Sequence, residues 1–296
     1  MENTCPCGDG KGANMKLSVI NKKGGTVRAL ASAEGKGRVH LVYEPVYKKG
    51  DRIRIKTDAP GNYEMRLEDT LMPAILYMNG TEAEFEIPFG QMRAGFSPRS
   101  FTGKRHFIEV REVLKSAPAE NQGATGQEHT CRNLAFNPYD GAENTGLFPH
   151  MSTNVTYPDT FRNRIFPDRG LFAARNVIDG VLANESHRLY PHQSWGINRD
   201  PNAYLTCEFG RPVDVESVRL AIRGEFPHDN YWVRGTLVFS DGSREEIAIK
   251  KTLDLQEFPI RKTGITSVTL CELIPSEEPS PFPALSLLEV YGRDPN

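Results

Sequence analysis

The alternation of apolar and polar residues is the strongest pattern in the chain. Segments such as DRIRIKT at 51–57 and EAEFEIPF at 82–89 place apolar side chains at every second position, which is the period of a half-buried strand. Gly, Pro, Asn and Asp separate these segments, as in NGTE at 79–82, and such residues favour tight turns. Long helical periodicity is almost absent. We therefore predict an all-β protein.

The first half of the chain contains short strand patterns separated by turn residues, an arrangement typical of a β-sandwich or barrel. We predict an N-terminal β-sandwich domain at 14–114, after a flexible Gly-rich tail at 1–13. Residues 115–130 are small and polar, which is the composition of a linker. The strands predicted in this domain are 16–20, 26–32, 38–44, 51–57, 63–69, 74–79, 82–89 and 106–113.

The second half, residues 131–296, continues the β pattern but carries longer loops rich in functional side chains. An irregular region runs from 137 to about 172, and a short helical turn is predicted at 173–180. The predicted strands are 132–136, 203–210, 215–223, 232–240, 244–251, 256–260, 267–273 and 284–292. We expect two β-sandwich domains in all.

Composition and charge narrow the function classes. The 296 residues include 36 Lys and Arg against 38 Asp and Glu, so no nucleic-acid or anionic-membrane partner is expected. No apolar run reaches the roughly 20 residues of a membrane-spanning helix. The N-terminus lacks signal-peptide features, and five dispersed cysteines suit a reducing compartment. We expect a cytoplasmic protein, or a secreted one if a leader has been removed. The sequence does not indicate an oligomeric state.

The second half also resembles a known family through several short motifs in order. These are NVIDG (176–180), SWG (194–196), LTCEFG (205–210), VESVRLAIR (215–223), FSDGS (239–243) and LLEVYG (287–292). The set resembles the galactose-binding-like family, also called discoidin or factor V/VIII type C domains. Many members are carbohydrate-binding modules of bacterial glycan-processing proteins. The resemblance implies a jelly-roll β-sandwich over 131–296, with ligand-binding loops at one end.

The stretch RGEFPHDNYW at 223–232 lies between two predicted strands. Apolar residues alternate up to Ile222, which places Arg223 on the face away from the core. Downstream, apolar residues at 233, 237 and 239 share one face, which places Trp232 on the other. Strand phase therefore predicts that Arg223 and Trp232 face outward at the two ends of one loop.

This loop has the chemistry of a sugar-binding site. A pyranose stacks its apolar face on an aromatic ring. Its hydroxyl groups donate hydrogen bonds to charged side chains and accept hydrogen bonds from them. We predict Arg223, Glu225, His228, Asp229 and Trp232 as ligand-binding residues. The alternative is an internal network, in which Arg223 pairs with Asp229 and Trp232 caps the end of the sandwich.

A second loop, RLYPHQSWGINRD at 188–200, could line the same site. We interpret Trp195 as a core residue, as the Trp at this place commonly is in the modules that the sequence resembles. His192 and Gln193 are further candidates for ligand binding.

The resemblance also implies a structural Ca²⁺ ion, because a loop around such an Asp-Gly motif often binds one in this family. The matching oxygen ligands would be Asp179 and Glu289, with Asn184 as a further donor. The Thr that usually follows the motif in the family is absent here. The alternative is that Asp179-Gly180 is a turn or a helix end. No other cofactor is expected.

Taken together, these patterns favour a non-catalytic carbohydrate-binding protein with a carbohydrate as its ligand. A glycoside hydrolase-like enzyme that uses Glu225, Asp229 and His228 is one alternative. A protein-interaction scaffold is another. No GxSxG, HExxH or phosphate-loop motif is present, so the balance is against an enzyme.

Overall fold

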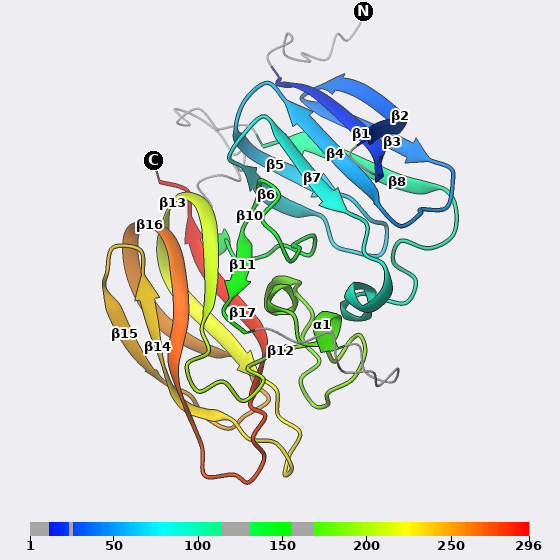
Figure 1. Ribbon diagram of the computed structural model, residues 1–296. Coiled ribbons are helices and arrows are strands. Elements are labelled where there is room, and N and C mark those ends of the chain that lie inside the picture. The colour runs from blue at the N-terminus through cyan, green and yellow to red at the C-terminus, as the bar shows by residue number, and fades with distance from the viewer. Residues whose placement is uncertain (1–11, 24–25, 114–130, 156–167, 296) are drawn as a thin grey trace, which may run out of the picture.

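The computed structural model describes residues 12–23, 26–113, 131–155 and 168–295. These residues form almost only β-structure, in three antiparallel sheets (Figure 1), which confirms the predicted all-β class. The predicted linker at 115–130 lies outside the described residues, as does the predicted tail apart from Gly12 and Ala13.

Two sheets form the N-terminal sandwich. The four-stranded sheet has the order β2 (Thr26–Lys36), β1 (Asn14–Lys23), β4 (Asp51–Thr57) and β7 (Glu82–Glu86). The five-stranded sheet has the order β10 (Leu147–Phe148), β6 (Ala74–Met78), β5 (Gly61–Arg66), β8 (His106–Glu112) and β3 (Arg38–Tyr43). A 3-10 helix, η1 (Gly90–Gly95), lies between β7 and β8 in sequence.

The alternation seen in the sequence places side chains on the two faces of each sheet. In β4, Ile53 and Ile55 are fully buried, whereas Arg52 and Arg54 face away from the core and pair with carboxylates of β7. Ile53 packs in one core with Tyr63 and Leu76 of the opposite sheet. Burial of these apolar side chains is the main force that holds the two sheets together.

A segment of the second half completes the first sandwich. β10 extends the five-stranded sheet beyond β6, and Leu147 and Tyr139 lie in the core of the N-terminal sandwich. The hydroxyl of Tyr139 donates to the backbone carbonyl of Met72 at 3.0 Å. The N-terminal sandwich therefore depends on residues beyond 131, and the predicted domain boundaries stay a prediction.

The third sheet forms the C-terminal sandwich. Its main path is β12 (Trp195–Gly196), β17 (Ala284–Arg293), β13 (Leu205–Ile222), β16 (Gln256–Pro275), β14 (Trp232–Phe239) and β15 (Arg244–Ala248). β11 (His150–Thr153) pairs with β13, and β9 (Arg132–Asn133) pairs with β17. Two short helical segments, α1 (Asp168–Leu171) and η3 (Ala174–Ile178), precede β12.

This single sheet makes both layers of the sandwich because its long strands bend. β13 and β16 each join two segments that the sequence predicts as separate strands. Their pairing register shifts between Glu208 and Val213, next to Gly210, which has a φ of +69°. Leu205 before the bend and Leu220 after it belong to one core. Gly210 allows the sharp turn because a residue without Cβ adopts positive φ easily.

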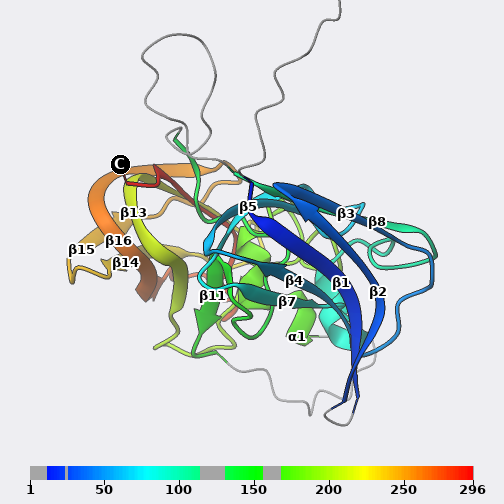
Figure 2. The same cartoon turned by 90° about the horizontal axis from the view of Figure 1, so that it is seen from above.

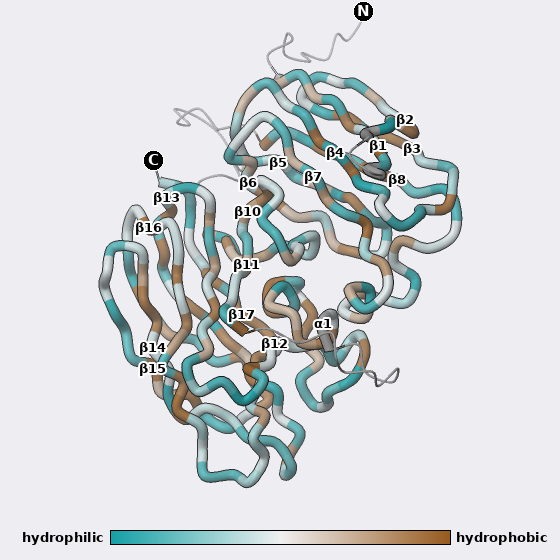
Figure 3. Tube along the Cα trace, viewed as in Figure 1, coloured by the Kyte–Doolittle hydropathy of each residue, from teal (hydrophilic) through white to brown (hydrophobic). Residues whose placement is uncertain are grey.

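The two sandwiches lie side by side, with β11 near their junction (Figures 1 and 2). Hydrophobic residues follow the strands, and hydrophilic stretches gather in many of the connections at the strand ends (Figure 3). Among the described residues, no helix has the length and apolar character needed to span a membrane.

Candidate functional site

The loop between β13 and β14 is held by a buried ion pair. Arg223 Nε donates to Asp229 Oδ2 at 2.6 Å, and both side chains are almost fully buried. Arg223 Nη2 also donates to the carbonyl of Phe282 at 3.1 Å, and Ser280 Oγ donates to Asp229 Oδ1 at 3.2 Å. The prediction that Arg223 faces outward is therefore wrong, because its charge is neutralised inside the loop, as in the alternative of an internal network.

Trp232 lies in the core of the C-terminal sandwich with 0% exposure. Its ring centroid is 6.0 Å from that of Trp195, which is also fully buried. The prediction that Trp232 faces outward is wrong because β14 is irregular. Val233 and Arg234 are both exposed, and the register with β16 shifts between Trp232 and Arg234. One extra residue reverses the face of every side chain before it. The core position predicted for Trp195 is confirmed.

The exposed part of the loop consists of Phe226, Pro227 and His228, and Glu225 before them is half-buried. Phe226 is 43% exposed. Glu225 Oε1 accepts from the backbone N–H of His187 at 2.9 Å, and Glu225 Oε2 pairs with the His187 ring. The aromatic ring that reaches solvent here is thus Phe226 rather than Trp232.

A lysine from another loop covers part of the Phe226 ring. Lys251 Nζ lies 4.8 Å from the ring centroid, within the range of a cation–π contact. Lys251 Nζ also pairs with Glu278 at 2.7 Å, which fixes the ammonium group beside the ring. We name the surface of His187, Glu225, Phe226, His228 and Lys251 the Phe226 face.

Asn184 joins the loops beneath the Phe226 face. Its side-chain amide donates to the backbone carbonyls of Ile222 at 3.0 Å and Leu253 at 2.9 Å, and its backbone carbonyl accepts from Gly224 N–H at 2.6 Å. A Cβ at Gly224 would lie 2.7 Å from the ring of Phe226, so glycine permits this close packing. Asn184 therefore anchors three chain segments by hydrogen bonds.

The other two candidate ligand residues lie in a loop that packs inward. Gln193 is buried and donates from Nε2 to Asp179 Oδ2 at 2.8 Å. His192 is half-buried, and its Nδ1 lies 3.3 Å from the carbonyl of Ala183. The structure thus directs the amide of Gln193 to Asp179 and not to the Phe226 face, and the ligand-binding role of both residues stays a prediction.

Asp179 and Glu289 do not fit the calcium site that the resemblance implies. Both carboxylate oxygens of Asp179 accept hydrogen bonds, from Val181 N–H and from Gln193, and Arg175 Nη2 lies 3.9 Å away. Burial raises the pKa of Asp179 to about 6, although the charge of Arg175 acts in the opposite direction. The guanidinium of Arg175 already supplies the positive charge that a calcium ion would bring.

Glu289 lies on β17 directly across from Arg219 of β13. Burial raises the pKa of this carboxyl group, and the charge of Arg219 opposes the rise. Within the part of the chain that the structure describes, no three His, Cys, Asp or Glu residues form a group that could hold a metal ion.

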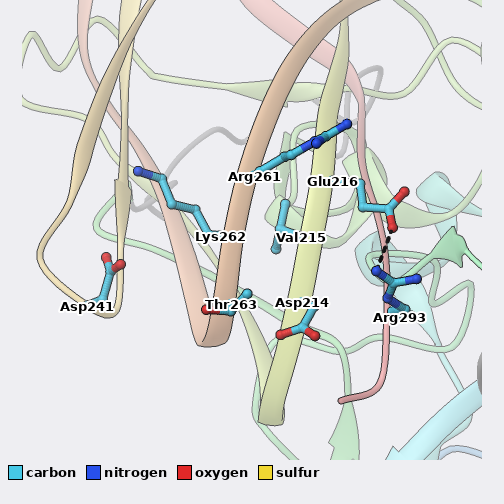
Figure 4. A pocket seen from close by; sticks show the side chains of 8 residues that line it. All are labelled: Asp214, Val215, Glu216, Asp241, Arg261, Lys262, Thr263 and Arg293. Carbon is cyan, nitrogen blue, oxygen red and sulfur yellow. Dashed lines mark ion pairs between the residues drawn. The ribbon is translucent and has the colours of Figure 1, made fainter. Parts of the chain in front are cut away.

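A charged cavity of about 510 Å³ lies where β13 and β16 bend, with the β14–β15 turn beside it (Figure 4). Its charges are largely satisfied within the protein: Arg293 pairs with Glu216 at 3.4 Å, Lys262 with Glu245 at 2.8 Å, and Asp214 accepts from Gly264 N–H at 3.0 Å. None of its described lining residues is aromatic. The Phe226 face therefore has the better chemistry for stacking a sugar ring.

The sequence pattern singled out the loop at 223–232, but it did not indicate Phe226, His187 or Lys251 as members of the candidate site. The position of Phe226 between Gly224 and Pro227 was a usable signal, because such a residue is held in a tight loop and has little room to turn inward. His187 and Lys251 come from distant segments, and no local pattern indicates their convergence.

No protein-family model matches the chain, and no curated protein matches it in sequence. Solved structures similar to it include carbohydrate-binding modules and lectin domains, the kind of protein that the sequence resemblance indicated. One is the lectin domain of lectinolysin in complex with Lewis B antigen, with a TM-score of 0.38 and 16% identity, covering 55% of this chain and 98% of that one.

Two further structures come from named bacteria. The chitosan-binding module 1 of a chitosanase/glucanase from Paenibacillus sp. IK-5 has a TM-score of 0.34 and 14% identity, covering 54% of this chain and 99% of that one. The family 32 module of NanJ from C. perfringens, in complex with galactose, has a TM-score of 0.34 and 13% identity, covering 48% of this chain and 91% of that one.

Proposed function

We propose that this chain is a non-catalytic carbohydrate-binding protein, and that it recognises a sugar through the loops at one end of the C-terminal sandwich. The observation that carries the proposal is the exposed ring of Phe226, held beside the His187–Glu225 pair and the ammonium group of Lys251. An apolar ring next to polar groups that both donate and accept is what a pyranose requires.

The parts of the Phe226 face have complementary roles. The free face of the Phe226 ring stacks against the apolar C–H face of a sugar. Lys251 donates to hydroxyl oxygens, Glu225 accepts from hydroxyl groups, and His187 and His228 extend the polar rim. The five side chains offer both signs of charge, which suits a neutral sugar.

Contacts within the protein hold the loop in place on both sides of Phe226. The buried Arg223–Asp229 pair and the three hydrogen bonds of Asn184 fix the backbone on both sides of Phe226. Binding then requires little ordering of the loop, and this preorganisation preserves affinity.

The same contacts weigh against the alternative of a glycoside hydrolase-like enzyme. That reaction needs two carboxyl groups that flank the scissile bond. Asp229 is buried in its pair with Arg223 and cannot reach a substrate from there. Glu225 is held by His187. Binding without turnover is therefore the function that these residues support best.

A glycan array followed by titration calorimetry tests the proposal. The wild-type protein is expected to retain at least one neutral glycan, and Phe226→Ala to weaken its binding by about 30-fold or more, since a central aromatic contact contributes at least about 2 kcal/mol. The matched control is Val42→Ala, which trims an apolar side chain that is 48% exposed on the N-terminal sandwich. The melting temperatures of both variants are expected to stay close to that of the wild type.

Three outcomes would count against the proposal. The first is that the wild-type protein retains no glycan. The second is that Phe226→Ala and Val42→Ala bind equally well. The third is that the wild-type protein releases a sugar product and Glu225→Gln does not. That result would establish the enzyme instead.

A further inference from the structure

Two adjoining cavities lie away from the Phe226 face, on the N-terminal sandwich and at its junction with the second half. The junction cavity has a volume of about 350 Å³. It is lined by residues of β4, β7 and η1, by residues 139–143 and Thr145 from the segment that precedes β10, and by Arg175. The edge cavity, of about 610 Å³, is lined by Asn21, Arg28, Leu30, Tyr43, Pro45, Lys48, Lys49 and Asp51. Lys49 lines both cavities, so they meet at this side chain.

The edge cavity has an excess of available positive charge. Its one acid, Asp51, is 1% exposed, and its carboxylate accepts from Asn21 Nδ2 at 2.6 Å and from Lys48 N–H at 2.7 Å. Arg28, Lys48 and Lys49 are exposed, and no ion pair joins them to a carboxylate of the described residues. Three exposed cations around one satisfied acid form a site for an anionic group.

Both cavities also offer apolar surface, which a small inorganic anion would not need. Leu30 and Pro45 are exposed in the edge cavity. Phe89 and Met92 are half-buried in the junction cavity. The same cavity is lined by Arg52 of β4, which pairs with Glu84 and Glu86 of β7, and by two further acids, Asp140 and Glu143. Each volume falls within the range of about 300–1,000 Å³ that is typical of ligand sites.

We propose that the two cavities together bind an acidic oligosaccharide. A carboxylate or sulfate group of the chain lies among Arg28, Lys48 and Lys49, and an adjacent sugar ring packs against Phe89 and Met92 in the junction cavity. The site gives the N-terminal sandwich a binding role of its own. It shares no residue with the Phe226 face, so it stands or falls independently of the proposed function.

Calorimetry with two matched hexasaccharides tests this site. The probes are hexagalacturonate and the same hexamer with its carboxyl groups reduced to hydroxymethyl groups. The wild-type protein is expected to bind the acidic hexamer more tightly, and Lys49→Glu to weaken that binding by about tenfold or more because it places a like charge at the point where the cavities meet. The control is Lys36→Glu, which makes the same charge change at an exposed position. Lys36 and Arg28 lie at opposite ends of β2. The control variant is expected to change affinity less than twofold.

Phe226→Ala separates the two sites. This variant is expected to bind hexagalacturonate as tightly as the wild type does. If the proposed function fails, only the binding of neutral glycans is affected. Similar affinity of the wild type for both hexamers would overturn the site, as would equal losses in Lys49→Glu and Lys36→Glu. If a hexathymidylate strand bound more tightly than hexagalacturonate, with the same dependence on Lys49, the site would belong to single-stranded nucleic acid and the sugar proposal would be wrong.

Discussion

The guanidinium of Arg223 and the carboxylate of Asp229 form a buried ion pair that closes the loop from β13 to β14. Arg223 follows the last residue of one strand, and Asp229 precedes the start of the next by three residues. The pair draws the two ends of the loop together and leaves Glu225, Phe226 and His228 at its exposed turn.

Removing one partner of this pair is expected to destabilise the fold strongly. Asp229→Ala removes the hydrogen-bonded partner of a buried guanidinium and leaves only the carboxylate of Glu225, 4.0 Å away, which costs about 3–5 kcal/mol of unfolding free energy. Urea denaturation measures the change. The control is Glu246→Ala, which breaks the exposed Arg234–Glu246 pair and is expected to cost less than about 1 kcal/mol. Equal losses in the two variants would contradict a structural role for the buried pair.

His150 makes stability depend on pH near neutrality. Burial lowers the pKa of its imidazole, but the hydrogen bond to Asp140 and the charges of Asp140 and Glu208 outweigh burial, so the pKa is raised above 6.5. A raised histidine pKa stabilises the fold fully below the unfolded pKa of about 6.5, and this contribution is lost as pH rises through the folded pKa.

We therefore expect the difference in unfolding free energy between the wild type and His150→Gln to be larger at pH 6 than at pH 9. Denaturation at both values measures it. In an Asp140→Asn background the same difference is expected to vary less with pH, because the hydrogen-bonded carboxylate is gone. A wild-type difference that is constant between the two pH values would refute the linkage.

Gly210 combines positive φ with close packing, so Gly210→Ala is expected to destabilise the protein. A Cβ there would lie 2.4 Å from the ring of the buried Phe148, and positive φ alone costs about 1–2 kcal/mol for an L-residue. Gly242, with a φ of +83° and no atom within 4 Å of its Cβ position, is the matched control. Thermal unfolding should show a larger loss for Gly210→Ala than for Gly242→Ala, and equal losses would show that only the backbone matters at Gly210.

The strands could be predicted from the sequence because their signal is local. In β4 and β7 the alternation alone separates core residues from the charged ladder on the outer face. The prediction failed where pairing is irregular: two predicted segments became one bent strand in both β13 and β16. Gly210 permits the bend in β13, but whether the two segments continue as one strand also depends on what they pack against, which a local pattern does not show.

The candidate site shows the same limit at the level of single residues. The loop at 223–232 was found because its polar and aromatic residues stand out between two strands. The assignment of Trp232 to its surface was wrong because the irregularity at Val233 and Arg234 reverses the strand phase. The roles of Arg223 and Asp229 could not be chosen from the sequence, since a charged pair suits both a binding site and an internal network.

The sequence by itself therefore determined the all-β class and most strand positions, and it singled out the candidate loop at 223–232, because strand period and turn chemistry act between near neighbours in the chain. Only the tertiary structure decided that Trp232 is a core residue, that Phe226 is the exposed ring, and that His187 and Lys251 come to lie beside it. Those outcomes depend on one irregularity in β14 and on the convergence of three separate loops, and long-range packing sets both.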